Sequence, residues 1–439
     1  MRTNFAGDTL CDPHLKEAER NLRACVHCGI CTATCPTYVL LGDERDSPRG
    51  RIVMMQQMLE QGGAPTAETV HHVDRCLSCL GCRTACPSGV DYARLVDTAR
   101  AHIESQYRRP WRARLTRLFL ARVLARPDLA KAAVALARTF APVAKRLPGA
   151  LGKMARIAAK APRRNRIAAA PEADAPRRIA LLTGCVQPAL APQIDEAVAR
   201  ILSRRGIALV PLENAGCCGA LAHHLGRRDD AQARAQSVIE NFERANRAAP
   251  LDAVLISATG CAAHLKDYPH LFAGKPAWKN RATTFAEKVR DFSAVAEPRV
   301  VDPPRRLKIA YQAPCSLQHG LRQSGFGEAQ LRAAGFEVID IPEGHLCCGS
   351  AGSYSILEPE IAGALRARKL ANIAMLDVDA VASPNIGCLM HLTGPDALPL
   401  IHPAELIDWA EGGPSPAAIP VPGQQHARGN VLTTWKHED

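Results

Sequence analysis

The chain has 439 residues, a hydrophobic fraction of 47%, 17 cysteines and a formal net charge of +12 at pH 7. Its length predicts two to four domains, and its composition is typical of a soluble globular protein, not a disordered one. The sequence contains no uninterrupted apolar run of about 18 residues, which excludes an ordinary membrane-spanning helix.

The first 20 residues hold no apolar segment of the kind that a secretory signal peptide needs. We therefore expect a cytoplasmic protein whose cysteines are reduced. In a reducing compartment, cysteines at regular short spacing are more often metal ligands or redox groups than disulfides.

The N-terminal cysteines form two copies of the motif C-x2-C-x2-C-x3-C-P, which begin at Cys25 and Cys76. This is the bacterial spacing for two [4Fe-4S] clusters, in which three thiolates hold one cluster and the fourth reaches the other. Pro36 and Pro87 fix the turn at which the fourth cysteine leaves. The predicted ligands are Cys25, Cys28, Cys31 and Cys86 for the first cluster, and Cys35, Cys76, Cys79 and Cys82 for the second.

Structural zinc is the alternative for these thiols, but it leaves the complete spacing unexplained. His27 lies between two ligands, where it either tunes a cluster through a hydrogen bond or is a solvated loop residue, and we favour the second role.

Clusters that share ligand segments must lie close together, so electrons can pass between them. With about −2 on each cluster, the net charge falls to roughly +8, which still favours an acidic partner or an anionic membrane surface.

The residues around these motifs indicate a helical domain, unlike the small β-hairpin ferredoxins. Residues 48–61 have apolar positions at i, i+3 and i+4 and end at Gly62, and a second helical pattern covers 91–105. We assign 1–105 to this helical ferredoxin-type domain. The composition of residues 106–178 predicts basic amphipathic helices followed by a flexible linker. For the helices we favour a solvated hairpin over a docking or membrane-surface face.

Beyond the linker the chain repeats itself. The first copy contains the segments RRIALLTGCVQPAL, GIALVPLENAGCCGA and LDAVLISATGCAAHL. The second copy contains the corresponding segments RLKIAYQAPCSLQHG, GFEVIDIPEGHLCCGS and VDAVASPNIGCLMHL. Each copy alternates β-branched runs with amphipathic segments, the pattern of βαβ units around a parallel sheet. We therefore expect a multidomain α and α/β protein, with repeated cysteine-rich domains at 179–300 and 301–439.

Each repeat places four cysteines just after its expected strands, where open α/β sheets usually have their sites. They are Cys185, Cys217, Cys218 and Cys261 in the first repeat, and Cys315, Cys347, Cys348 and Cys388 in the second. A cluster or metal is favoured over inert buried thiols and over a redox dithiol. For His264 and His391 we favour a packing role over metal ligation. The case for metal ligation is weaker still for His223, His224 and His345, which flank the Cys-Cys pairs.

The order of these motifs resembles the iron–sulfur subunit of bacterial glycolate oxidase. The resemblance rests on RACVHCGICTATCPTYVLLGDERDSPRGRI, DRCLSCLGCRTACPSGV, NAGCCGA and HLCCGSAGSY, and it covers nearly all of the chain except the basic linker. It implies flavin (FAD) subunits that oxidise glycolate to glyoxylate, with D-lactate as a further substrate. Electrons would then pass through this chain to a membrane quinone-type acceptor on the cytoplasmic face.

Related families share this architecture: cluster subunits of anaerobic glycerol-3-phosphate dehydrogenase, lactate-utilisation proteins and heterodisulfide reductase subunits. In the last of these, such domains end in Cys-x2-Cys and bind noncubane clusters, whereas both copies here end in Cys-x2-His, which argues against a five-thiolate cluster. No dinucleotide, nucleoside triphosphate or acyl-transfer motif is present, so we expect the substrate site on another polypeptide.

Three other functions remain open. The chain could be the cluster subunit of a related lactate or glycerol-3-phosphate dehydrogenase. The repeats would form a catalytic site of their own if they reduced quinone or a disulfide. A cluster-based redox sensor that binds nucleic acid is the weaker alternative, because the basic residues accompany no helix-turn-helix and no aromatic platform.

Overall fold

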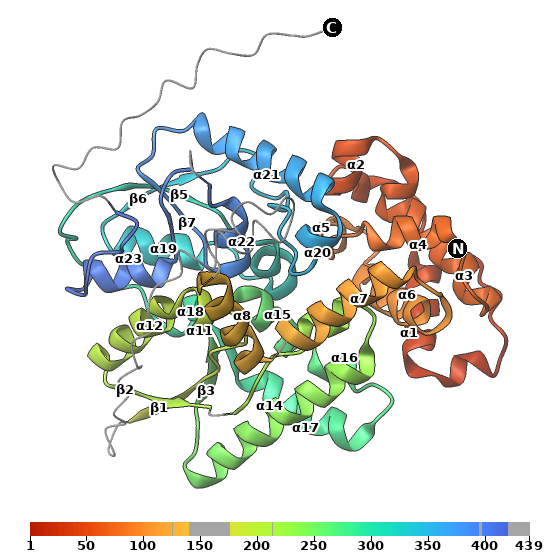
Figure 1. Ribbon diagram of the computed structural model, residues 1–439, viewed down its shortest axis with the longest axis horizontal. Coiled ribbons are helices and arrows are strands. Elements are labelled where there is room, and N and C mark those ends of the chain that lie inside the picture. The colour runs from red at the N-terminus through yellow and green to blue at the C-terminus, as the bar shows by residue number, and fades with distance from the viewer. Residues whose placement is uncertain (125, 140–175, 213, 395–396, 420–439) are drawn as a thin grey trace, which may run out of the picture.

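The computed structural model describes residues 1–124, 126–139, 176–212, 214–394 and 397–419. In Figure 1, a helical N-terminal part lies beside two α/β parts, one built on the strands β1–β3 and the other on β5–β7. This is the multidomain α and α/β architecture that the sequence predicts.

The N-terminal part is built from helices joined by short loops that contain the cysteine motifs. Its helices are α1 (Pro13–Ala24), α2 (Pro36–Leu41), α3 (Pro48–Gln61), α4 (Ala67–Asp74), α5 (Gly81–Ala85) and α6 (Tyr92–Gln106). The prediction of a helix over 48–61 is confirmed: Ser47 caps its first turn through Gly50 N, and Gly62 ends it in the left-handed region at φ 70°. Buried Leu22, Met55 and Leu95 join α1, α3 and α6 in one core.

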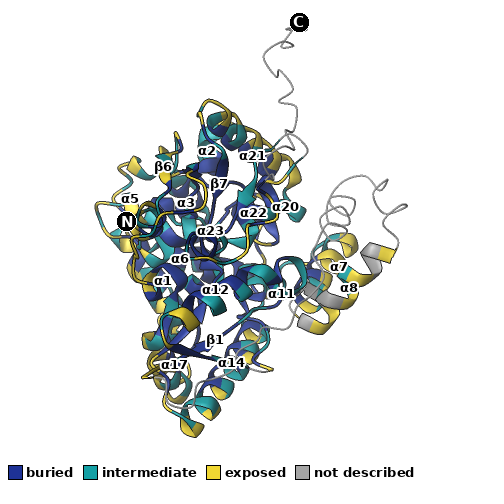
Figure 2. Cartoon of the chain, turned by 90° about the vertical axis from the view of Figure 1, so that its left-hand side faces the viewer, coloured by how far each residue is buried: buried dark blue, intermediate teal, exposed yellow. Residues whose placement is uncertain are grey.

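The basic segment after α6 begins with α7 (Trp111–Phe119), a π-helical turn (Leu120–Leu124) and α8 (Pro127–Thr139). Figure 2 shows both helices at the edge of the molecule, with exposed residues along them. The helical start of this segment therefore agrees with the prediction, while the predicted linker at 140–175 lies outside the described residues.

Two four-stranded parallel sheets follow, with equivalent strand orders β2-β1-β3-β4 and β6-β5-β7-β8. The first contains β1 (Arg177–Leu181), β2 (Ile207–Pro211), β3 (Ala253–Ile256) and β4 (Val289–Asp291). The second contains β5 (Lys308–Tyr311), β6 (Glu337–Asp340), β7 (Ala380–Ala382) and β8 (Leu400–Ile401). Ile179 of β1 pairs with Leu209 and Ala253, as Ile309 of β5 pairs with Val338 and Ala380, so the repeat in sequence is a repeat in register.

Helices cover both sheets. The first repeat has α11 (Gln187–Leu190), α12 (Pro192–Arg204), α13 (Ala220–His224), α14 (Arg228–Ala248), α15 (Thr259–Lys266), α16 (Tyr268–Leu271), α17 (Pro276–Lys288) and α18 (Phe292–Val295). The second has a π-helical turn (Ser316–Leu321), α19 (Phe326–Ala333), α20 (Tyr354–Leu357), α21 (Pro359–Ala374), α22 (Ile386–Leu392) and α23 (Pro403–Ala410).

The two repeats share one hydrophobic core. Ile179 and Leu255 of the first sheet belong to the same buried cluster as Ile309 and Trp409 of the second repeat. Arg200 and Arg204 on α12 also bind the buried carboxylate of Asp408 on α23. The two repeats are therefore packed together.

Candidate iron–sulfur sites

The first predicted group of four cysteines lines one cavity of the N-terminal part. Cys25, Cys28, Cys31 and Cys86 all face it. The loop can turn its thiols inward because His27 and Gly29 adopt left-handed backbone angles, φ 57° and φ 80°. This site reaches the surface, since Cys28 is exposed and the adjoining Val26 and Ile30 are 67% and 53% exposed.

The second predicted group lines a neighbouring cavity. Cys35, Cys76, Cys79 and Cys82 face it, and Ser78 and Leu80 supply the left-handed turns of this loop. Cys82, Pro48 and Tyr92 line both cavities, so the two sites share walls. The structure thus brings together the two crossed sets of four sulfur donors, one near the surface and one in the interior.

These thiols suit metal ions that stabilise thiolates. Burial raises the pKa of Cys79 and Cys82 well above the ordinary value, and burial with neighbouring thiols raises the pKa of Cys31 to about 11. A thiol must lose its proton to ligate iron, and in a buried cavity bound cations offset the charge that results. Four sulfur donors at each place are the ligand set that a [4Fe-4S] cluster requires.

Two buried arginines flank the second cavity, and sequence reasoning did not single them out. Arg51, 1% exposed, donates to Cys35 Sγ at 3.8 Å, to His72 O at 2.7 Å and to Asp46 Oδ1 at 3.1 Å. Arg100 donates to Ser78 Oγ at 2.7 Å and to Cys76 O at 2.5 Å. Both hold the ligand loops in place, and their charge favours the more negative state of a cluster.

The repeated cysteines also converge. In the second repeat, Cys315 Sγ lies 3.9 Å from Cys347 Sγ, and Cys348 Sγ lies 3.2 Å from Cys388 Sγ. In the first repeat the Cys217 thiol contacts those of Cys185 and Cys218, and Cys218 contacts Cys261. The contacts with Cys185 and Cys218 lower the pKa of Cys217 well below its usual value. Each repeat therefore gathers four thiols, which we call the first and second thiol quartets.

The second thiol quartet lies beside the second ferredoxin-type site. Cys79 and Leu77 belong to the same apolar cluster as Cys315 and Cys347. Tyr354 Oη donates to Arg75 O at 2.9 Å, and the Thr84 hydroxyl is 2.8 Å from His319 Nδ1. These contacts hold the second repeat against the loop that contains Cys76 and Cys79.

The histidines near the quartets have different surroundings. His391 Nε2 donates a hydrogen bond to the carbonyl oxygen of Ala362 at 3.1 Å, and His345 is exposed. His264 packs against His223 and Tyr268, with ring centroids 5.1 and 5.5 Å apart. His224 lines a small cavity together with Cys76 and Leu77.

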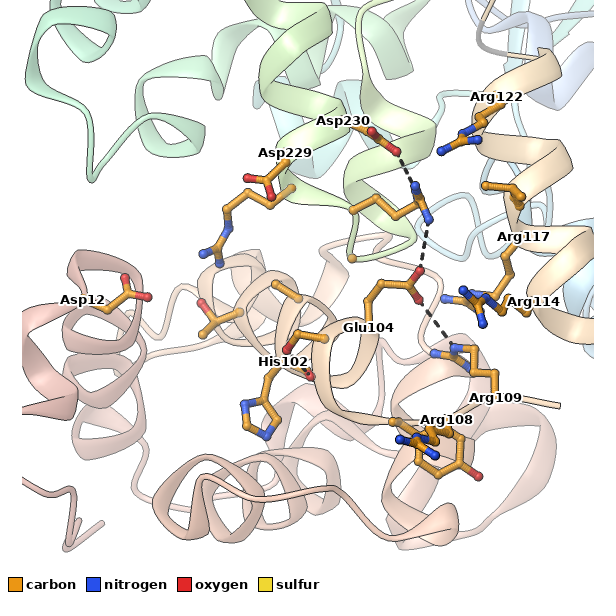
Figure 3. A pocket seen from close by; sticks show the side chains of 18 of the residues that line it. Asp12, His102, Glu104, Arg108, Arg109, Arg114, Arg117, Arg122, Asp229 and Asp230 are labelled. Atoms are coloured by element: carbon orange, nitrogen blue, oxygen red, sulfur yellow. Dashed lines mark hydrogen bonds and ion pairs between the residues drawn. The ribbon is translucent and has the colours of Figure 1, made fainter. Parts of the chain in front are cut away.

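A wide arginine groove of about 1320 Å³ lies between α6, α7 and the start of α14 (Figure 3). Glu104 binds Arg109 and Arg227, and Arg227 also binds Asp230. The groove is lined by Arg108, Arg109, Arg114, Arg117, Arg122, Arg227 and Arg228, against Asp12, Glu104, Asp229 and Asp230. Burial lowers the pKa of Arg117 and Arg228, as expected for cations that have lost water.

Next to this groove, α7 exposes an apolar stripe. Trp111, Leu115 and Phe119 are 66%, 55% and 44% exposed, and they recur every four residues along one side of the helix. Among the described residues, no helix is both long and apolar enough to cross a membrane.

Comparisons with known proteins agree with these features. Residues 21–90 match the family described as the 4Fe-4S dicluster domain, and residues 179–266 and 309–393 match the cysteine-rich domain known as CCG. In the solved structures, a hypothetical protein from Helicobacter pylori aligns with a TM-score of 0.53 and 8% identity over 92% of this chain and 73% of that one, which shows a shared fold.

Two similar sequences cover most of the chain. The glycolate oxidase iron-sulfur subunit of Escherichia coli K12 is 38% identical over 93% of this chain and 99% of its own length. A probable glycolate oxidase iron-sulfur subunit of Bacillus subtilis is 28% identical over 85% of this chain and 89% of its own. Lactate utilization protein A of Geobacillus thermodenitrificans is 28% identical over 49% of this chain and 90% of its own. The chain belongs to the family of glycolate oxidase iron–sulfur subunits.

Proposed function

We propose that this chain is the electron-relay subunit of a glycolate dehydrogenase complex. Cys25, Cys28, Cys31 and Cys86 would hold one [4Fe-4S] cluster, and Cys35, Cys76, Cys79 and Cys82 the other. When bound, such clusters accept and pass on single electrons without binding substrate. The observation that supports this proposal is that the eight cysteines line two adjoining cavities, with Cys82 in the shared wall and the other seven divided as the crossed motif requires.

The exposure of the two sites suggests a direction for the relay. Cys28, Val26 and Ile30 lie at the surface, where a partner subunit can approach the first site. The second site is enclosed by Arg51 and adjoins Cys315 and Cys347. We assign electron entry to the first site, and we propose that the thiol quartets hold further clusters, with the second quartet next to the second site.

The partners follow from what this chain supplies. The proposed complex contains flavin (FAD) subunits that oxidise glycolate to glyoxylate, because the sequence offers sulfur ligands but no recognised device for a flavin or a dinucleotide. D-lactate is a second candidate substrate, and the likeness to lactate utilization protein A supports lactate in general. Disulfide reduction by the quartets is less well supported, since Cys347, Cys348 and Cys388 are all buried.

We place the complex at the cytoplasmic face of a membrane, with quinone as acceptor. The stripe on α7 and the arginine groove support this placement. An apolar helix face beside a row of arginines suits the interface of an anionic bilayer.

The test uses the complex of this chain with its flavin subunits. Glycolate-driven reduction of a soluble quinone should fall at least about tenfold in Cys79→Ser, while reduction of a dye that takes electrons directly from flavin stays near the wild-type rate. Cys11→Ser is the matched control, since Cys11 is exposed and lies outside both motifs. Normal quinone reduction in Cys79→Ser, with its iron content lowered, would refute the relay.

A further inference from the structure

A group of metal-ligand side chains lies between the N-terminal helices and the first repeat. Asp97 comes from α6, and His223 and His224 end α13, just after the Cys217-Cys218 pair. One potential ligand atom from each residue lies within 4.8 Å of the other two. His223 Nε2 is 3.9 Å from Asp97 Oδ2, which is too long for a hydrogen bond.

The polar atoms of this group are poorly satisfied. Asp97 and His223 are buried, at 8% and 6% exposed. His224 Nδ1 and the nearby His264 Nε2 are buried without a hydrogen-bond partner. Buried polar atoms are nearly always paired, so a cluster of unpaired ones at one place indicates an ion or ordered water.

The protonation states suit a cation. Burial lowers the pKa of His223 and of His224 to about 3, so both imidazoles are neutral at pH 7 and offer a lone pair. Two imidazoles and one carboxylate are a common donor set for divalent first-row metals, zinc among them. His264, whose ring centroid is 5.1 Å from that of His223, packs beside this group.

The neighbouring cations are mostly engaged elsewhere. Arg94 forms a two-pronged pair with Asp267 at 2.5 and 2.6 Å, and Arg100 is held by Ser78 and Cys76 O. Arg228 also faces Asp97, but it is shared with Asp12 and Asp229.

From these observations we propose that Asp97, His223 and His224 bind a divalent transition-metal ion, zinc in the first place. The ion would tie α6 to the first repeat beside the first thiol quartet. This site is separate from the iron–sulfur sites and would act as a cross-link between two parts of the chain.

Zinc K-edge X-ray absorption of the iron-loaded full-length chain, after zinc addition and desalting, tests the proposal. We expect one zinc per chain with nitrogen and oxygen ligands at about 2.0–2.1 Å. Asp97→Asn and, separately, His224→Ala should each weaken zinc binding at least about tenfold with no change in iron content. Asp229→Asn, an exposed carboxylate at the start of α14, is the matched control.

Sulfur ligands at about 2.3 Å would place the zinc at cysteines and overturn the proposal. So would the absence of tightly bound zinc from the wild-type chain, or unchanged binding in a folded variant. The His224→Ala variant keeps the test decisive if Asp97→Asn does not fold, since His224 is the less buried of the two.

Discussion

Arg51 is a full positive charge in the interior of the N-terminal part. It joins Asp46, Thr37 and the Cys35 sulfur in one buried network that Arg75 and His72 complete. Removing one member of a buried ion pair leaves the other uncompensated, which typically costs about 3–5 kcal/mol. At this residue, stability and the electrostatics of the second site are therefore linked.

We expect Arg51→Gln to lower the thermal unfolding midpoint and to shift the reduction potential of the second site downward, because a positive charge beside Cys35 is lost. Arg51→Lys should restore part of the potential. The measurement is a redox titration followed by electron paramagnetic resonance. Arg20→Gln removes an exposed arginine paired with Glu17 and should change neither quantity appreciably. An unchanged potential in Arg51→Gln would show that the arginine acts only on folding.

Asp195 gives a pH dependence with a definite sign. Burial on α12 raises the pKa of its carboxyl to about 7, despite hydrogen bonds from Gln187 and Ser257. In the unfolded chain the proton leaves near the ordinary value of 3.8. Between these values the folded state binds more protons, so the stability from this group is present below about pH 4 and is lost as the pH rises to about 7.

Asp195→Asn keeps the group neutral at every pH. Its urea unfolding midpoint should exceed that of the wild type at pH 8, corresponding to about 1–3 kcal/mol, and this advantage should shrink at pH 5. Asp302→Asn, at a carboxylate that is 79% exposed, should show no such trend. An advantage that is the same at pH 5 and pH 8 would contradict the assignment.

At the residue scale, spacing alone predicted two groups of four cysteines, because local loop geometry decides which thiols can face one cavity. The eight cysteines do line two adjoining cavities, and their ligation of clusters stays a prediction. Arg51, Arg100 and Asp97 could not be found in this way, since their partners Cys35, Ser78 and His223 come from other segments. For Arg51, the available sequence signal was its position within the apolar helical pattern of residues 48–61.

The element with the clearest unexplained surface is α7. Its residues Trp111, Leu115 and Phe119 point to one side, and Arg114 and Arg122 line the adjoining groove. A solvated helix would not be expected to expose three large apolar side chains in register. This favours a docking or membrane-surface face over the solvated hairpin that we preferred from the sequence.

We expect replacing Trp111, Leu115 and Phe119 together by serine to weaken binding to anionic phospholipid vesicles at least about tenfold. Wild-type binding should also weaken between 0.1 and 0.5 M salt, because the arginines act electrostatically. Vesicle co-sedimentation measures both effects. The control replaces Val300 and Met375, which are 90% and 70% exposed elsewhere. If the triple variant binds vesicles normally but loses its flavin partners, the stripe is a protein interface.

At the same scale, periodicity located most elements. The β-branched runs marked β1, β2 and β3, because parallel strands buried on both faces have a distinctive composition. The π-helical turns at Leu120–Leu124 and Ser316–Leu321 had no sequence signal, since they depend on packing against neighbouring helices.

For the whole molecule, the internal repeat predicted two similar α/β units but not how they meet the N-terminal helices. The second quartet adjoins Cys79, whereas the first repeat meets α6 through His223. Such an asymmetry depends on contacts like that of Tyr354 with Arg75, which link residues far apart in sequence. The order of sites in the proposed relay therefore depends on how the two repeats pack against the N-terminal helices.

The most direct test of the two-cluster claim is the iron and acid-labile sulfide content per chain of the anaerobically purified protein, with electron paramagnetic resonance of the reduced sample. The full-length Cys217→Ser/Cys347→Ser variant should retain about eight iron atoms and two interacting signals, and the wild type should hold about sixteen. About eight iron atoms per chain in both the variant and the wild type would mean that the thiol quartets hold no clusters, and would leave the two-cluster claim intact. Near-zero iron in the variant and the wild type, with zinc in its place, would contradict the account.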